Sequence, residues 1–162
     1  MLRSHKLFAT ALALSAVLSA PAVLVAAPAA TASTAATSCR VEFYDLDAID
    51  VAESDGKDEL RLKVDGYLWP AGWVNMREGD DADPGHFSNV TATVSGNGTE
   101  SFSLREVTPP AVGSGVSLGS ITAYGGTCQM LDVGEIYPYT QNLVGTYETP
   151  YWYVMKLRMI GQ

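Results

Sequence analysis

The protein has 162 residues, and 10 Lys and Arg against 18 Asp and Glu give it a formal net charge of -8. This length fits one domain, or one domain preceded by a targeting segment. The acidic excess argues against nucleic acid as a partner, because phosphate binding needs clustered Lys and Arg. Two cysteines without a Cys-x-x-Cys spacing exclude a cysteine-based zinc site.

Residues 1–32 have the features of a secretory signal peptide. A basic start precedes an apolar run rich in Ala and Leu, and Ala30-Thr31-Ala32 forms an A-x-A cleavage site. The alternative, an uncleaved membrane anchor, is disfavoured by Pro21 and Pro28. We therefore expect a secreted protein without a transmembrane anchor.

Residues 33–38 are expected to form a short flexible tail, and residues 39–162 a single domain. Export brings Cys39 and Cys128 into an oxidising environment, so we expect a disulfide between them. The alternative is a lipid anchor on Cys39. It is disfavoured because Ala36 stands where a lipoprotein signal carries a large aliphatic residue.

Apolar and polar residues alternate through the domain, which is the pattern of half-buried strands. The clearest example is residues 59–64, and the longest is residues 151–160. Asn97-Gly98 stands between two such runs and predicts a hairpin. Seven or eight short strands with regular turn signals indicate an all-β fold, an antiparallel β-sandwich or barrel, and we favour a sandwich of about eight strands. The predicted strands lie near residues 41–45, 59–64, 90–95, 102–106, 118–123, 128–133 and 151–160.

Acidic residues are concentrated in two segments, residues 45–59 and residues 78–83. Clustered carboxylates on loops are what Ca²⁺ requires, since this ion takes six to eight oxygen ligands. The alternative is a pair of solvated acidic loops that keep the protein soluble. The candidate metal ligands are Asp50, Glu53, Asp55, Asp58 and Glu59.

The segment Glu53–Val64, ESDGKDELRLKV, resembles the first calcium loop and following strand of C2 domains. The family motif runs Asp-x-x-Gly-x-Ser-Asp-Pro-Tyr-Val-Lys-Val, and Glu53 and Glu59 fall where the family places two ligating aspartates. The Leu-Gly-Ser-Ile sequence at residues 118–121 is similar to the strand start after the family's last calcium loop. The resemblance implies a C2-like antiparallel sandwich with ion and ligand loops at one end.

The family's second ligand cluster, an Asp-x-Asp followed by a third Asp, is missing. In that region only Glu106 offers a carboxylate, and Val116 stands at the position of the third Asp. The resemblance therefore implies at most one weak calcium site, or a C2-like sandwich that has lost its calcium.

Trp69, Trp73 and Tyr139 are candidates for a ligand-binding aromatic surface. A proline beside Trp69 and another beside Tyr139 indicate loops, and exposed aromatic rings bind sugar rings or protein partners. His86 is the only histidine after the leader and lies in a turn, which disfavours a Ser-His-Asp arrangement.

We therefore expect a secreted, non-catalytic, C2-like binding module that holds calcium as its cofactor through the acidic loop. The alternatives are a carbohydrate- or cell-wall-binding module that uses exposed aromatics, and a secreted inhibitor of another protein. The expected partner is an extracellular protein or polysaccharide, and the sequence specifies neither this ligand nor an oligomeric state.

Overall fold

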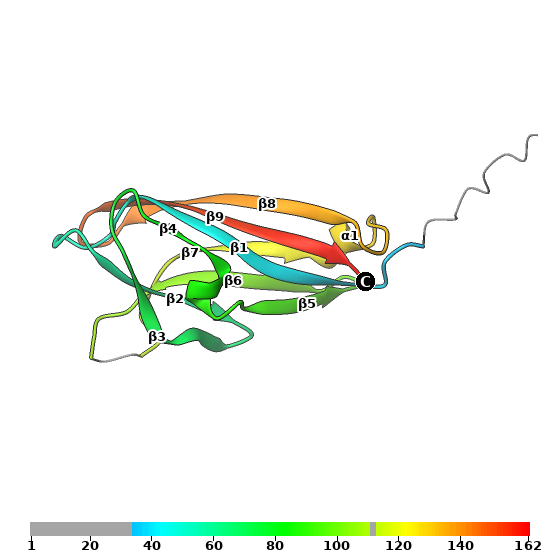
Figure 1. Cartoon of the computed structure of the whole chain (residues 1–162), viewed down its shortest axis with the longest axis horizontal. Coiled ribbons are helices and arrows are strands. Elements are labelled where there is room, and N and C mark those ends of the chain that lie inside the picture. The colour runs from blue at the N-terminus through cyan, green and yellow to red at the C-terminus, as the bar shows by residue number, and fades with distance from the viewer. Residues whose placement is uncertain (1–33, 111–112) are drawn as a thin grey trace, which may run out of the picture. The chain divides into compact units, whose positions relative to one another are not determined.

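The structure is a computed structural model that describes residues 34–110 and 113–162. In this part of the chain nine strands form two antiparallel sheets, which confirms the all-β sandwich (Figure 1). The first sheet contains β1 (Ser38–Asp50), β4 (Asp81–Ala82), β5 (Thr91–Ser95), β8 (Ile136–Thr146) and β9 (Pro150–Gly161). The second contains β2 (Asp58–Val64), β3 (Tyr67–Met76), β6 (Thr99–Glu106) and β7 (Val116–Tyr124).

The first sheet has the order β4-β1-β9-β8. β5 pairs with the first half of β1, whereas β4 pairs with a later part of β1. The second has the order β3-β2-β6-β7. Two short helical segments interrupt the strands, the 3-10 helix η1 (Pro84–Phe87) and the helix α1 (Gly125–Cys128). The last described strand, β9, therefore lies inside its sheet between β1 and β8.

The core lies between the two sheets and is built from the strand faces that the alternation predicts. Tyr153, Met155, Leu157 and Met159 of β9 are buried on one side. Leu60, Leu62 and Val64 of β2, with Phe102 and Leu104 of β6, are buried on the other. Each buried side chain of this size contributes about 1.5–3 kcal/mol through apolar burial, so these two faces hold the sheets together.

The predicted disulfide between Cys39 and Cys128 is present, with a Cα–Cα distance of 5.7 Å. It joins the start of β1 to the end of α1, and both cysteines are buried. The bond closes a sequence separation of 89 residues. A loop of this length is worth about 4–5 kcal/mol in the chain-entropy account of disulfides.

The structure differs from the expected flexible tail at residues 34–38. Ala36 is buried and its backbone N–H donates to the carbonyl of Leu131 at 2.8 Å. Ala35 forms a β-bridge with Asp132, and Ser38 already belongs to β1. The predicted signal peptide at residues 1–32 lies outside the described residues, and across the described ranges no helix has the length and apolarity to cross a membrane.

The hairpin predicted at Asn97-Gly98 is wrong. A tight turn does form there, with the Gly98 N–H donating to the Ser95 carbonyl at 2.9 Å. The two flanking strands, however, belong to different sheets, because β5 pairs with β1 and β6 pairs with β2 and β7. The turn is therefore an arch between the sheets.

Four connections gather at the end of the sandwich on the left of Figure 1, opposite the C terminus. They are the β1–β2, β3–β4, β6–β7 and β8–β9 loops. We call this end the loop end. It brings the β1–β2 loop at residues 51–57, which lies within the predicted acidic segment 45–59, beside segments that lie far from it in the sequence.

Candidate calcium site at the loop end

The acidic β1–β2 loop is held in place by a carboxylate that points into the core. Asp58 is buried and accepts hydrogen bonds from the backbone N–H of Ala52, at 3.0 and 2.8 Å, and from that of Glu53, at 2.8 Å. The hydroxyl of Tyr153 donates a further hydrogen bond to it. The sequence predicts Asp58 as a metal ligand. In the structure it instead serves as an anchor, because its oxygens are already used by these donors.

The β8–β9 loop holds the acidic loop from its other side. The Thr149 hydroxyl donates to the carbonyl of Val51 at 2.8 Å. The hydroxyl of Ser54 donates to the Glu148 carboxylate at 2.8 Å. Glu53 lies between these two contacts in sequence, so its backbone is fixed on both sides.

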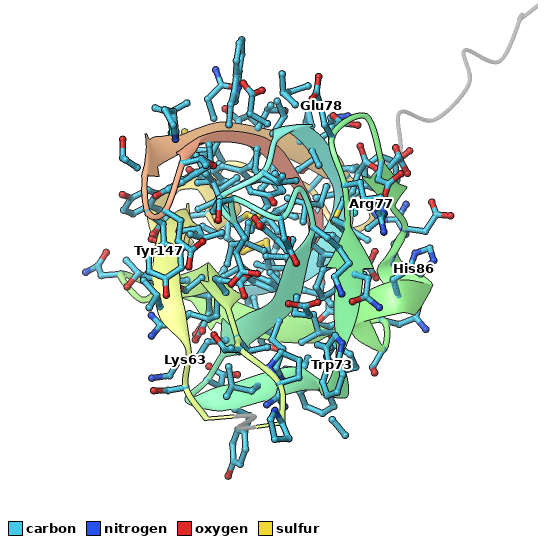
Figure 2. The ribbon with its side chains drawn as sticks, turned by 90° about the vertical axis from the view of Figure 1, so that its left-hand side faces the viewer. Lys63, Trp73, Arg77, Glu78, His86 and Tyr147 are labelled. Carbon is cyan, nitrogen blue, oxygen red and sulfur yellow. A yellow bond between two sulfur atoms is a disulfide. The ribbon has the colours of Figure 1, made fainter. Side chains whose placement is uncertain are left out.

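Three carboxylates from three chain segments converge at this end, which Figure 2 views directly. They belong to Glu53 in the β1–β2 loop, Glu59 at the start of β2 and Glu106 at the end of β6. One carboxylate oxygen from each lies within 4.8 Å of the other two. Calcium–oxygen distances are about 2.3–2.6 Å, so ligands of one ion are separated by up to about 5 Å. The three oxygens are therefore close enough to share one ion.

Glu106 is the member of this cluster that most needs a partner. Its side chain is only 2 % exposed, and among the described residues neither carboxylate oxygen accepts a hydrogen bond. Burial first, and then the charges of Glu53, Asp58 and Glu59, raise its pKa to about 9. At neutral pH the group therefore carries a proton, which it can donate toward Glu53, unless a cation replaces that proton.

The β6–β7 loop closes over the backbone of Glu106. Arg105 fixes the loop by donating to the carbonyl of Ser114 at 2.8 Å and to that of Gly115 at 2.7 Å. Gly115 has φ = 59°, and a Cβ on it would lie 1.9 Å from the Glu106 carbonyl oxygen. Only glycine allows this close approach of the loop to the β6 backbone.

A lysine partly neutralises the cluster. The Lys57 ammonium forms an ion pair with Glu59, which raises the pKa of Lys57. The pKa of Glu53 is raised by burial and by the negative charges around it, of which Glu59 contributes most. The site therefore holds three carboxylates and one competing ammonium group, a combination that favours weak binding of a divalent cation.

Two of the five predicted metal ligands, Glu53 and Glu59, enter this cluster. Asp50 is exposed at the end of β1. Asp55 is also exposed, and its carboxylate accepts a hydrogen bond from the Lys57 N–H at 2.9 Å. Glu106 is not among the predicted ligands. The sequence does indicate that Glu106 points inward, because it follows Phe102 and Leu104 in the inward-facing alternation of β6.

A second acidic group joins the two acidic segments of the sequence. Asp47 pairs in register with Asp81, and Asp45 lies within the same 4.8 Å group. Here the protein supplies its own cation, since the Lys156 ammonium pairs with Asp45 and lies 2.8 Å from Asp47. This arrangement gives two of the three carboxylates, those of Asp45 and Asp47, a cationic partner from the protein itself.

The aromatic candidates do not form one surface. Trp69 and Trp73 are each 39 % exposed and lie on β3, an edge strand of the second sheet. Tyr139 lies on β8 in the first sheet, opposite the buried Leu157, and its hydroxyl is buried. The loop expected at Tyr139 is instead a strand, and the register turns this side chain inward. His86 is exposed and accepts a hydrogen bond from the Asp83 N–H at 3.1 Å.

No family model matches the sequence, and no curated protein matches it. Among solved structures, the chain is similar to a C2 domain of plant extended synaptotagmin 1, with 11% identity and a TM-score of 0.47, over 76% of this chain and 92% of that one. It is also similar to a pair of C2 domains from extended synaptotagmin 2, with 13% identity and a TM-score of 0.46. That match covers 94% of this chain and 47% of the other, so this chain spans about half its length. Both structures consist of C2 domains, and the likeness concerns the arrangement of strands alone.

Proposed function

We propose that the protein is a secreted, non-catalytic binding module, a C2-like β-sandwich that holds one calcium ion at its loop end. Glu53, Glu59 and Glu106 are the ligands. The observation that carries this proposal is the buried carboxylate of Glu106, which as an anion has no partner among the described residues. A buried carboxylate is costly unless a proton or a cation neutralises it.

The chemistry of the ligands favours calcium among the common cations. All three are hard oxygen donors, and together they supply up to six of the six to eight oxygens that Ca²⁺ takes. Magnesium requires a tighter octahedron and keeps several of its waters, which a buried group of three carboxylates does not favour. With nitrogen and sulfur donors absent from the cluster, zinc is a poorer match.

The proposed location suits a weak site. The buried disulfide fits an oxidising compartment. Extracellular calcium-binding modules have dissociation constants of roughly 10⁻⁴–10⁻³ M. The ion pair between Lys57 and Glu59 favours affinity in that weak range.

The proposal is tested by titrating the mature protein with Ca²⁺. Calorimetry measures the binding, and thermal unfolding measures the gain in stability. With a dissociation constant of about 1 mM, 10 mM Ca²⁺ stabilises the fold by about 1.4 kcal/mol, because only the folded state binds the ion. We expect this stabilisation of the wild type with Ca²⁺ and a smaller stabilisation with Mg²⁺. Neither ion should stabilise Glu106→Gln. The exposed Glu78, labelled in Figure 2, provides the matched control Glu78→Gln, which should respond like the wild type. An equal response in Glu106→Gln and wild type would reject the site.

A further inference from the structure

A separate concave site lies on the outer face of the first sheet, where β1, β9 and β8 run side by side. Its volume is about 290 Å³. Its walls are formed by Tyr44 on β1, by Ile136 and Pro138 on β8, and by Lys156 and Arg158 on β9. This volume is at the lower end of the range for small-molecule sites, so it suits one or two small rings.

Tyr44 faces outward and lines this site beside a β-bulge in β1. β1 and β9 pair regularly at Phe43 and Leu157 and again at Asp45 and Lys156, which leaves Tyr44 as the extra residue. Because of the bulge, Tyr44 and Asp45 both face outward, and the buried alternation resumes at Leu46. Tyr44 is 50 % exposed, and the guanidinium carbon of Arg158 lies 5.3 Å from its ring centroid. The ring is therefore a supported, exposed apolar surface.

Ion pairs hold the polar groups of the site in fixed positions. Arg158 pairs through Nε with Glu42, and Glu42 also lies 3.0 Å from Nη2 of Arg40. Lys156 pairs with Asp45 in the next row of the sheet. Each carboxylate keeps lone pairs that can accept further hydrogen bonds, and each cation keeps further N–H groups that can donate.

The two signs of charge in these rows cancel each other. A strongly anionic ligand would meet Glu42 and Asp45, and a cationic ligand would meet Lys156 and Arg158. A neutral ligand with adjacent hydroxyl groups uses the donors and the acceptors together. Its apolar C–H face would lie on Tyr44 and Pro138, as sugar rings do on aromatic and aliphatic surfaces.

A second recess continues the site across the ion pair. It has a volume of about 150 Å³, and its lining includes Glu42, Asn89, Thr91 and Arg158. Arg158 lines both recesses. Because the two recesses share this side chain, a ligand longer than one ring can lie across it and fill both.

From this geometry we infer that the outer face of the first sheet binds a neutral oligosaccharide, with one pyranose ring on Tyr44 and its hydroxyl groups on the ion pairs of Lys156 and Arg158. The site uses none of the calcium ligands. Of the three aromatic candidates indicated by the sequence, Trp69 and Trp73 lie outside this site, whereas Tyr139 is among its lining residues.

Native electrophoresis of the mature protein through gels that contain soluble polysaccharides tests this inference. The gels carry neutral galactomannan, mixed-linkage glucan, arabinoxylan or dextran, and polygalacturonate as the acidic counterpart. We expect at least one neutral polymer to retard the protein, with a dissociation constant of roughly 10⁻⁴–10⁻³ M set by the few contacts available. Retardation should persist in a calcium chelator, which separates this site from the loop end.

Tyr44 provides the decisive variants. Tyr44→Ala should weaken retardation at least tenfold, whereas Tyr44→Phe keeps the ring and should bind almost normally. Tyr124→Ala is the matched control, because Tyr124 is 54 % exposed on the other sheet. The inference fails if no neutral polymer retards the protein, if polygalacturonate retards it more than all of them, or if Tyr44→Ala binds like the wild type. If no polysaccharide retards the protein, and the wild type is a dimer that the Tyr44→Ala substitution dissociates, this face serves self-association instead.

Discussion

Replacing Glu106 with glutamine should stabilise the protein, and the gain should depend on pH. The wild-type carboxyl ionises near pH 4.5 when unfolded, while its pKa in the folded state is about 9. The folded state therefore takes up a proton at neutral pH, and stability falls as pH rises from the unfolded pKa toward the folded one. Glutamine has a similar shape and is neutral at every pH, so it avoids this proton uptake.

The size of the effect follows from the two pKa values. At pH 7 the unfolded carboxyl lies 2.5 pH units above its pKa of 4.5, and each unit is worth about 1.4 kcal/mol. Glu106→Gln should therefore gain about 3 kcal/mol at pH 7. The gain should be close to zero at pH 4, where both states of the wild type are protonated. It should grow by about 1.4 kcal/mol for each pH unit between pH 5 and 8.5.

Urea unfolding at pH 4, 5, 7 and 8.5, without calcium, measures this difference. Glu78→Gln removes a charge from an exposed position at the same end and should change stability by less than about 0.5 kcal/mol. A gain for Glu106→Gln that is the same at every pH would refute the reasoning, because Glu106 would then take up no proton on folding. Calcium should narrow the gap between wild type and Glu106→Gln, since the ion replaces the proton in the wild type alone.

Three further predictions concern the loop end and the disulfide. Lys57→Gln frees Glu59 from its ion pair and should tighten calcium binding about two- to fivefold in calorimetry. An unchanged affinity would show that the ammonium group of Lys57 does not compete with calcium. Asp58→Asn replaces a buried acceptor of three backbone and hydroxyl donors, and should cost about 2–4 kcal/mol in urea unfolding. A cost below about 0.5 kcal/mol would show that Asp58 does not anchor the acidic loop. Replacing Cys39 and Cys128 together with serine should cost about 4 kcal/mol, read from the same unfolding curves, and a neutral effect would show that the closed loop adds no stability.

The strand faces could be predicted because the alternation is a local signal. Residues 59–64 and 151–160 place their apolar side chains on one face, and the structure buries that face. The same alternation also predicts which acidic side chains point into the core. Asp58 shares the face of Leu60, and Glu106 shares the face of Leu104, so both carboxylates point inward.

Partner choice between strands could not be predicted in the same way. Asn97-Gly98 specifies a tight turn, but which sheet receives each strand depends on β1, which ends at Asp50, far earlier in the chain. The bulge at Tyr44 has the same origin, since it appears only when β1 is aligned against β9. The saccharide site depends on that alignment and therefore leaves no pattern in any one segment.

The position of β9 has a consequence for how the chain acquires its structure. β1 and β8 flank this strand, so until it has been synthesised β8 has no partner in the first sheet and β1 has only β4 and β5. Contacts of such long sequence separation make folding slow. The outer face that carries Tyr44, Lys156 and Arg158, proposed above as the saccharide site, is therefore complete only when β9 has entered its sheet.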